Sequence, residues 1–172
     1  YGHGRGLVAE LGLTARVGAL VGTLSKALGS QGGFVCGSRL LVEYLVNSAR
    51  PFVYTTGPAP ACAGAALAAL RIVRNDRGRL ARLWDNVQRV RAGLHAQTRR
   101  GAGPIIPVLC GSAAAALRIA DGLLARGYLA PAIRPPTVPR GSARVRLTVS
   151  AAHTPAQCDG LLAALHSLFD QG

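Results

Sequence analysis

The chain has 172 residues, of which 49% are hydrophobic, and its formal net charge is +13. A chain of this length forms one ordinary domain or two small ones, and a charged fraction of 16% with positive mean hydropathy excludes an intrinsically disordered chain. The sequence contains no methionine, so we expect it to be processed, trimmed or a portion of a longer protein. It also contains nineteen arginines and one lysine, Lys26, which singles this lysine out for attention.

The first half of the chain alternates predicted strands and helices. Short apolar runs predict strands, apolar side chains at helical spacing predict helices, and Pro51 ends one of these helices. The predicted elements are strands over 17–24 and 34–36, helices over 40–47 and 61–74, and an extended segment over 52–54.

The second half begins after a break at residues 75–79, which predicts a domain boundary between segments 1–76 and 77–172. Thr154 and Gln157 have the spacing of a capping box before the last helix. The predicted elements are helices over 80–98, from Ser112 to near Gly127 and after Thr154, strands over 104–109 and 143–149, and an extended proline-rich segment over 131–142. Strands that alternate with helices predict an α/β fold.

The positive net charge is compatible with nucleic acid or an acidic surface as a partner. Residues 71–100 hold nine arginines, but the apolar side chains between them recur at helical spacing, which places the arginines on the solvent-facing side of a helix. We therefore predict a solvated helix face and no nucleic-acid partner. A basic binding module built on residues 77–100 is the alternative hypothesis.

The cysteines and histidines do not form a metal-binding pattern. No CxxC pair occurs among the four cysteines, and the four histidines do not cluster. We predict that the thiols are small buried apolar groups of a cytoplasmic protein. The longest apolar stretch, residues 57–70, is too short and too weakly hydrophobic to span a membrane, so no membrane association is predicted.

The segment GTLSKALGSQGG, residues 22–33, carries the single lysine. A lysine that follows an apolar strand, beside small hydroxyl residues and glycines, can act as an amine nucleophile. Thr23 and Ser25 could hydrogen-bond a phosphate, and the glycines allow close approach of the backbone. The alternative is a lysine in an ordinary surface turn. A Walker-type phosphate loop is excluded because GxxxxGK[ST] does not occur.

Two further segments carry candidate binding groups. In RPFVYTTGPAPA, residues 50–61, Thr55 and Thr56 precede a helix, where hydroxyls and free amides can bind an anion or simply cap the helix. In residues 132–154, Arg134 stands on a stiff Pro-Pro stretch and could pair with a carboxylate, or could be an exposed arginine on a rigid connection. His153 is interpreted as a structural histidine near the start of the last helix.

Together these three segments resemble the α-oxoamine synthases, enzymes of fold-type I that use pyridoxal 5′-phosphate (PLP). The resemblance extends from the GHGRG at residues 2–6 to the last helix. It implies an α/β fold made of the end of the large PLP-binding domain, residues 1–76, and the whole small C-terminal domain, residues 77–172. Within the family, Ser25 and the RPPTVP string distinguish the sequence from glycine C-acetyltransferases, which remain the alternative.

The resemblance also implies roles for individual residues. Lys26 matches the Schiff-base lysine, which also transfers a proton at the substrate α-carbon, and Thr23 matches a threonine that contacts the cofactor phosphate. Thr55 and Thr56 match the position that reaches the phosphate bound by the other subunit of a homodimer.

Substrate roles follow in the same way. Arg134 matches the arginine expected to hold the amino-acid carboxylate, and Thr137 matches a substrate-contacting threonine. The implied reaction condenses L-alanine with a pimeloyl thioester, on coenzyme A or a carrier protein, to 8-amino-7-oxononanoate of biotin biosynthesis, with release of CO2. The family's ring-pairing aspartate and ring-stacking histidine precede the position that matches Tyr1. We therefore expect the 172 residues alone to be inactive.

Overall fold

The structure is a computed structural model that describes residues 2–94 and 103–170. The chain divides into two compact units, Tyr1–Arg77 and Gly78–Gly172. We call them unit 1 and unit 2 and describe each by itself. Residues 95–98, the end of one predicted helix, lie outside the described residues. The assignment of the two segments to a large and a small enzyme domain stays a prediction.

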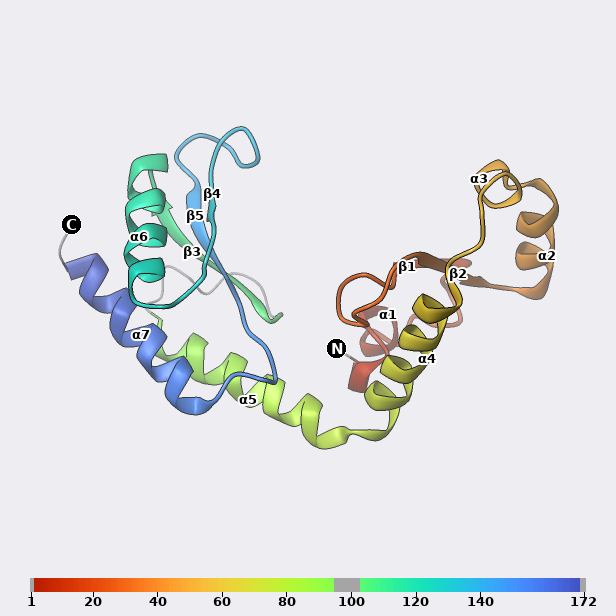
Figure 1. Cartoon of the computed structure of the whole chain (residues 1–172), viewed down its shortest axis with the longest axis horizontal. Coiled ribbons are helices and arrows are strands. Elements are labelled where there is room, and N and C mark those ends of the chain that lie inside the picture. Colours follow the sequence, from red (N-terminus) through yellow and green to blue (C-terminus); the bar gives the residue numbers. More distant parts are fainter. Residues whose placement is uncertain (1, 95–102, 171–172) are drawn as a thin grey trace. The chain divides into compact units, whose positions relative to one another are not determined.

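Unit 1 is built on a two-stranded antiparallel sheet (Figure 1). Its elements are η1 (Gly2–Gly4), α1 (Leu7–Glu10), β1 (Ala19–Thr23), β2 (Gly33–Gly37), α2 (Arg39–Ser48), α3 (Arg50–Val53) and α4 (Pro60–Asn75). Both predicted strands and the predicted helices over 40–47 and 61–74 are present. Gly22 lies opposite Phe34 in the ladder, and a Cβ at Gly22 would collide with the Phe34 ring. The glycine is therefore needed for the close packing of the ring against β1.

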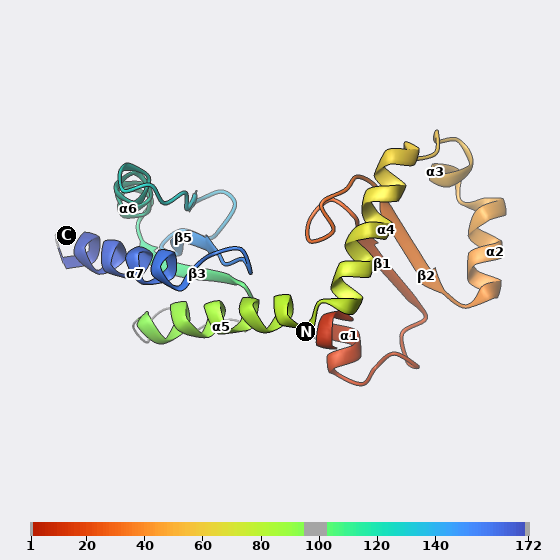
Figure 2. The same cartoon turned by 60° about the horizontal axis from the view of Figure 1, so that its bottom comes forward.

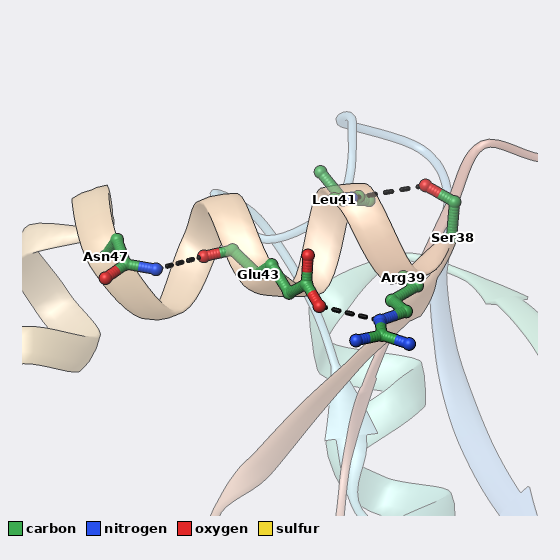
Figure 3. A network of polar contacts seen from close by, with 5 residues as sticks. All are labelled: Ser38, Arg39, Leu41, Glu43 and Asn47. Carbon is green, nitrogen blue, oxygen red and sulfur yellow. Dashed lines mark hydrogen bonds and ion pairs between the residues drawn. The ribbon is translucent and has the colours of Figure 1, made fainter.

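Helix α2 is held by contacts between near neighbours in the chain (Figure 3). The Ser38 hydroxyl caps its start by accepting a hydrogen bond from the Leu41 amide, at 3.2 Å. Arg39 forms an ion pair with Glu43 at 2.7 Å, and the Asn47 side-chain amide donates to the Glu43 carbonyl oxygen, also at 2.7 Å. Because both charged side chains are largely exposed, this ion pair adds little stability.

The extended segment predicted for residues 52–54 is wrong. Residues Arg50–Val53 form the short helix α3. Pro51 lies in its first turn, where a missing amide proton costs nothing because the first amides of a helix have no partner within it. Ala49 separates α2 from α3, and the proline is accommodated in the first turn of the second helix.

Unit 2 is a three-stranded antiparallel sheet with helices on one face (Figures 1 and 2). Its elements are α5 (Arg77–Gly93), β3 (Ile105–Gly111), α6 (Ala113–Ala125), β4 (Ala132–Ile133), β5 (Ala143–Thr148) and α7 (Pro155–Asp170). The strand order is β3-β5-β4, so β5, the last strand in the sequence, is the central one. The predicted helices and strands of this half are present within the described residues.

The core of unit 2 follows from alternation along its strands. Ile106, Val108, Val145 and Leu147 are buried and pack in one cluster with side chains of α5, α6 and α7. Side chains of a strand alternate between the two faces, so the intervening residues of β3 and β5 point to the opposite, helix-free face. That uncovered face holds Ile105, Pro107, Leu109, Arg144, Arg146 and Thr148, all half-buried or exposed.

The capping box predicted before the last helix is confirmed. The Gln157 side chain accepts from the Thr154 amide at 2.9 Å, and the Thr154 hydroxyl accepts from the Gln157 amide at 3.2 Å. His153 has a structural contact, since its Nδ1 accepts from the Ser150 amide at 3.2 Å. In the turn next to α7, the buried Asn86 of α5 donates to the carbonyl oxygens of Ser150 and His153 at 3.0 and 2.8 Å.

The solvated arginine face is confirmed for the described arginines up to Arg89, but Arg91 is half-buried and donates to the Gly103 carbonyl oxygen at 2.9 Å. Val87, Val90 and Leu94 are buried, whereas the arginines from 71 to 89 are exposed. Arg89 forms an ion pair with Asp159 of α7 at 3.1 Å. The arginines up to Arg89 therefore face solvent, and Arg89 links α5 to α7.

The prediction that the thiols are buried holds only in part. Cys158 is buried and Cys62 and Cys110 are half-buried, but Cys36 is exposed because unit 1 has no layer over this position of β2. Burial raises the pKa of the Cys158 thiol and of the Cys110 thiol above 9.0.

Two features are absent from the described residues. No helix there is long and apolar enough to cross a membrane. No cluster of three or more histidine, cysteine, aspartate or glutamate side chains in those same residues could hold a metal ion.

Candidate functional site

Lys26 lies in a nine-residue turn, Leu24–Gly32, that joins β1 to β2. The Leu24 amide donates to the Gly32 carbonyl oxygen at 2.9 Å, and the Ser30 amide donates to the Leu24 carbonyl oxygen at 2.9 Å. Gly29 and Gly32 have φ angles of 58° and 111°, in the region that favours glycine. The glycines of the sequence motif thus shape a closed turn that presents the lysine.

The Lys26 side chain is exposed. Within residues 2–94 and 103–170, no hydrogen bond or ion pair engages its ammonium group. The amine is therefore accessible to a molecule that enters from solvent.

Two hydroxyl groups lie beside the start of this turn. Thr23 Oγ1 and Ser25 Oγ are 2.6 Å apart, and the Ser25 amide donates to Thr23 Oγ1 at 3.1 Å. Both residues are exposed, and both are close in sequence to Lys26. The structure thus brings two exposed hydroxyls next to a turn with an accessible amine, a donor set that suits a phosphate and a carbonyl group on one molecule.

Thr55 and Thr56 lie in the segment between α3 and α4, and both are exposed. The N-cap residue of α4 is Ala59, and no side chain caps this helix. The hydroxyls therefore do not serve the capping role that was the alternative to anion binding. The segment leads into the first turn of α4, where the Ser30 hydroxyl of the lysine turn donates to the Cys62 carbonyl oxygen at 2.6 Å.

Arg134 and Thr137 lie together in unit 2, directly after β4. The Thr137 amide donates to the Arg134 carbonyl oxygen at 3.1 Å, which closes a turn around Pro135 and Pro136. Both side chains are exposed, so the guanidinium is available to an anion. Arg134 and Thr137 belong to unit 2, whereas Lys26 belongs to unit 1.

A second arginine was missed as a candidate for carboxylate binding. Arg146 is exposed on the helix-free face of the sheet, in the central strand β5, whereas its neighbour on that face, Arg144, donates from Nε to the Ser142 carbonyl oxygen at 2.9 Å. The signal was in the sequence, since the alternation over residues 143–149 places both arginines on the face away from the core.

Unit 2 also contains a cavity of about 270 Å³ between β5, α5 and α7. Its walls are mostly apolar, and their polar members are Tyr128, Thr148, His153, Gln157 and Cys158. None of the residues predicted for the site lines it.

The comparison with protein families decides the classification. A family model described as aminotransferase class I and II matches residues 3–165. The chain belongs to this family. The expected fold class, part of a fold-type I PLP-dependent transferase, is thereby confirmed.

Comparison with individual relatives shows which members of the aminotransferase family this chain resembles in sequence. It is 52% identical over 171 residues to a putative 8-amino-7-oxononanoate synthase from Desulforudis audaxviator and 49% identical over 172 residues to an 8-amino-7-oxononanoate synthase from Alkalilimnicola ehrlichii. Each match covers 98% of this chain and 44% of the relative. The chain thus spans less than half the length of these relatives.

Solved structures of α-oxoamine synthases superpose on this chain. A serine palmitoyltransferase from Sphingomonas wittichii is 31% identical with a TM-score of 0.92, and a structure of SPT with PLP as internal aldimine is 29% identical with a TM-score of 0.91. Both matches cover 98% of this chain and 44% of the other. An 8-amino-7-oxononanoate synthase from Francisella tularensis is 27% identical with a TM-score of 0.76, covering 89% of this chain and 46% of that one. The resemblance to the α-oxoamine synthases is confirmed.

Proposed function

We propose that this chain is the lysine-bearing part of a PLP-dependent C-acyltransferase that condenses L-alanine with a pimeloyl thioester to 8-amino-7-oxononanoate and CO2, in biotin biosynthesis. The observation that carries the proposal is the 49–52% identity, across nearly the whole chain, to relatives named for that activity. The accessible amine of Lys26 beside two hydroxyls supports it.

The residues present fit PLP as the cofactor. An exposed amine without a partner among the described residues can bond to the cofactor's aldehyde, and the Thr23 and Ser25 hydroxyls can hydrogen-bond its phosphate. PLP, when bound, serves as the electron sink for a carbanion at the substrate α-carbon. The protein's own contribution is then to hold the cofactor through Lys26 and Thr23 and to move a proton at the α-carbon through the Lys26 amine.

The proposed assembly is a cytoplasmic homodimer. Thr55 and Thr56 have exposed hydroxyls that are not used for capping, which supports a role toward the phosphate of the partner subunit. Large apolar side chains on α2 and α3 are exposed, among them Leu40, Tyr44 and Phe52, and these offer surface for subunit contact. The four free cysteines are in keeping with a reducing compartment.

Arg134 is proposed to hold the carboxylate of L-alanine, with Thr137 beside it. A guanidinium on a short, proline-stiffened turn loses little side-chain freedom when it pairs with a carboxylate, which favours the pairing. Arg146 is the second candidate for the same carboxylate because it is also exposed on unit 2. The thioester acyl group would be the second substrate, on coenzyme A or a carrier protein.

One observation favours a different acyl donor. The TM-scores are higher for the serine palmitoyltransferases than for the F. tularensis 8-amino-7-oxononanoate synthase, 0.92 and 0.91 against 0.76. We give more weight to identity, because the backbone fold is common to enzymes with different donors whereas side chains select the donor. Serine with a long-chain acyl thioester is nevertheless the competing substrate pair.

The test uses the complete gene product that contains this chain. With L-alanine and pimeloyl-CoA, or the pimeloyl carrier protein, we expect 8-amino-7-oxononanoate by mass spectrometry, and no comparable product from serine and palmitoyl-CoA. Lys26→Ala and Lys26→Arg should each lower kcat by roughly 10³-fold or more, because neither variant has an amine that can lose its proton. Borohydride treatment should attach the cofactor to the wild-type protein at Lys26 and to neither variant. Product from serine instead of alanine would overturn the proposed substrates.

A further inference from the structure

We propose that Ser30 is a positioning residue for Lys26, acting through its hydrogen bond to the first turn of α4. The role rests on the proposed function of Lys26 and extends it to a residue outside the set predicted from the sequence. The Ser30 hydroxyl donates to the Cys62 carbonyl oxygen at 2.6 Å, across 32 residues of sequence.

The other hydrogen bonds of the lysine turn are local, and they include the bonds of Thr23 Oγ1 with Ser25 and with the Gly32 carbonyl oxygen. The bonds from the amides of Leu24, Gly29 and Ser30 all end on carbonyl oxygens within the turn, and they set its shape without anchoring it to a neighbouring element. In the described part of the chain, the Ser30–Cys62 bond is the one hydrogen bond that joins this turn to α4. The position of Lys26 relative to α4 therefore depends on this bond.

Burial makes the bond effective. Ser30 and Cys62 are both half-buried, unlike Thr23, Ser25 and Lys26, which are exposed. A hydrogen bond shielded from water competes less with solvent, so it holds the turn more firmly than an exposed one. The turn thus has an anchored end at Ser30 and an accessible end at Lys26.

The anchor point also matters. Cys62 is the third residue of α4, and the segment with Thr55 and Thr56 leads directly into this helix. Through one bond Ser30 therefore links the turn with the proposed cofactor lysine to the helix that follows the proposed phosphate-binding threonines. A misplacement of about 1 Å at a reacting group can lower a rate by roughly 10²-fold, so even a modest anchor affects catalysis.

The test compares Ser30→Ala with the conservative Ser30→Thr, which keeps the hydroxyl, in the complete gene product. Ser48→Ala is the matched control, because the Ser48 hydroxyl also donates to a carbonyl oxygen at 2.6 Å, but within its own helix α2. In cofactor-free protein, Ser30→Ala should speed amide hydrogen exchange at Gly29 and Ser30 by roughly twofold to tenfold, whereas the other two variants should stay near wild type.

In the holoenzyme, Ser30→Ala should lower kcat by about tenfold and slow borohydride capture of the cofactor at Lys26, with KM for the acyl donor unchanged. Ser30→Thr should restore both quantities. The proposal would be overturned if Ser30→Ala kept the amide exchange rates and the kcat of the wild type. It would also be overturned if Ser48→Ala lowered kcat as much as Ser30→Ala does. The exchange measurement needs neither cofactor nor substrate, so a wrong acyl donor would defeat the proposed function and leave this result standing.

Discussion

The two units differ in where their apolar side chains lie. In unit 2, side chains from three helices and two strands form one closed core, whereas Ala66 is the one buried apolar residue found among the described residues of unit 1. Leu40, Tyr54 and Val21 of unit 1 are 79%, 77% and 75% exposed. Unit 2 thus stabilises itself, and unit 1, which holds Lys26, needs apolar surface from outside itself to reach the same stability.

The largest expected consequence is that the amides of the two units differ in their protection against hydrogen exchange. In the 172-residue chain, amides of residues 78–94 and 103–170 should exchange more slowly than those of residues 2–77, by roughly two orders of magnitude at the best-protected positions, because the core of unit 2 must open before they exchange. Hydrogen exchange read by mass spectrometry measures this directly. Equal protection in the two units would contradict the comparison.

A matched pair of leucines sharpens the same contrast. Leu165 of α7 is fully buried and Leu40 of α2 is 79% exposed. Leu165→Ala should lower the free energy of unfolding by about 2–5 kcal/mol, since it leaves a cavity in the core of unit 2. Leu40→Ala should change it by less than about 0.5 kcal/mol in the isolated chain. Urea titrations followed by circular dichroism would measure both, and comparable losses would argue against the difference in packing.

Two asparagines test whether hydrogen bonds contribute more to stability in unit 2 than in unit 1. Asn86 is buried, and Asn86→Ala would remove its part-buried bonds to the carbonyl oxygens of Ser150 and His153, which should destabilise unit 2 by about 1–3 kcal/mol. Asn47→Ala removes a bond to the Glu43 carbonyl oxygen on an exposed helix and should have a smaller effect. Thermal unfolding of both variants measures the difference, and an Asn47 effect as large as that of Asn86 would be inconsistent with it.

The smallest expected effect is a pH dependence in unit 2. Burial raises the pKa of the Cys158 thiol above its ordinary value of 9.0, so its stabilising contribution is complete below that value and is lost as pH rises through the raised pKa. The free energy of unfolding should therefore fall as the pH rises above 9.0, and fall less in Cys158→Ala. Urea titrations at several pH values would measure the free energy of unfolding of both proteins. An equal dependence on pH in Cys158→Ala and in the wild type would contradict the prediction.

Local elements could be predicted from the sequence because their causes lie close together in the chain. The capping box of Thr154 and Gln157 needs residues three apart, and the apolar spacing of α5 needs no distant partner. Prediction failed at α3, where Pro51 is compatible with both an extended segment and a first helical turn. It failed at Cys36 because exposure depends on which layer covers a strand.

For the candidate site, the sequence by itself determined which residue types stand in which motif: the single Lys26 in a glycine-containing turn, two hydroxyls before it, and Arg134 on a proline-stiffened segment. These are properties of neighbouring residues. Only the tertiary structure decided that β5 is the central strand and that Ser30 reaches Cys62. Those contacts join residues far apart in the chain, and their formation depends on packing of the whole unit.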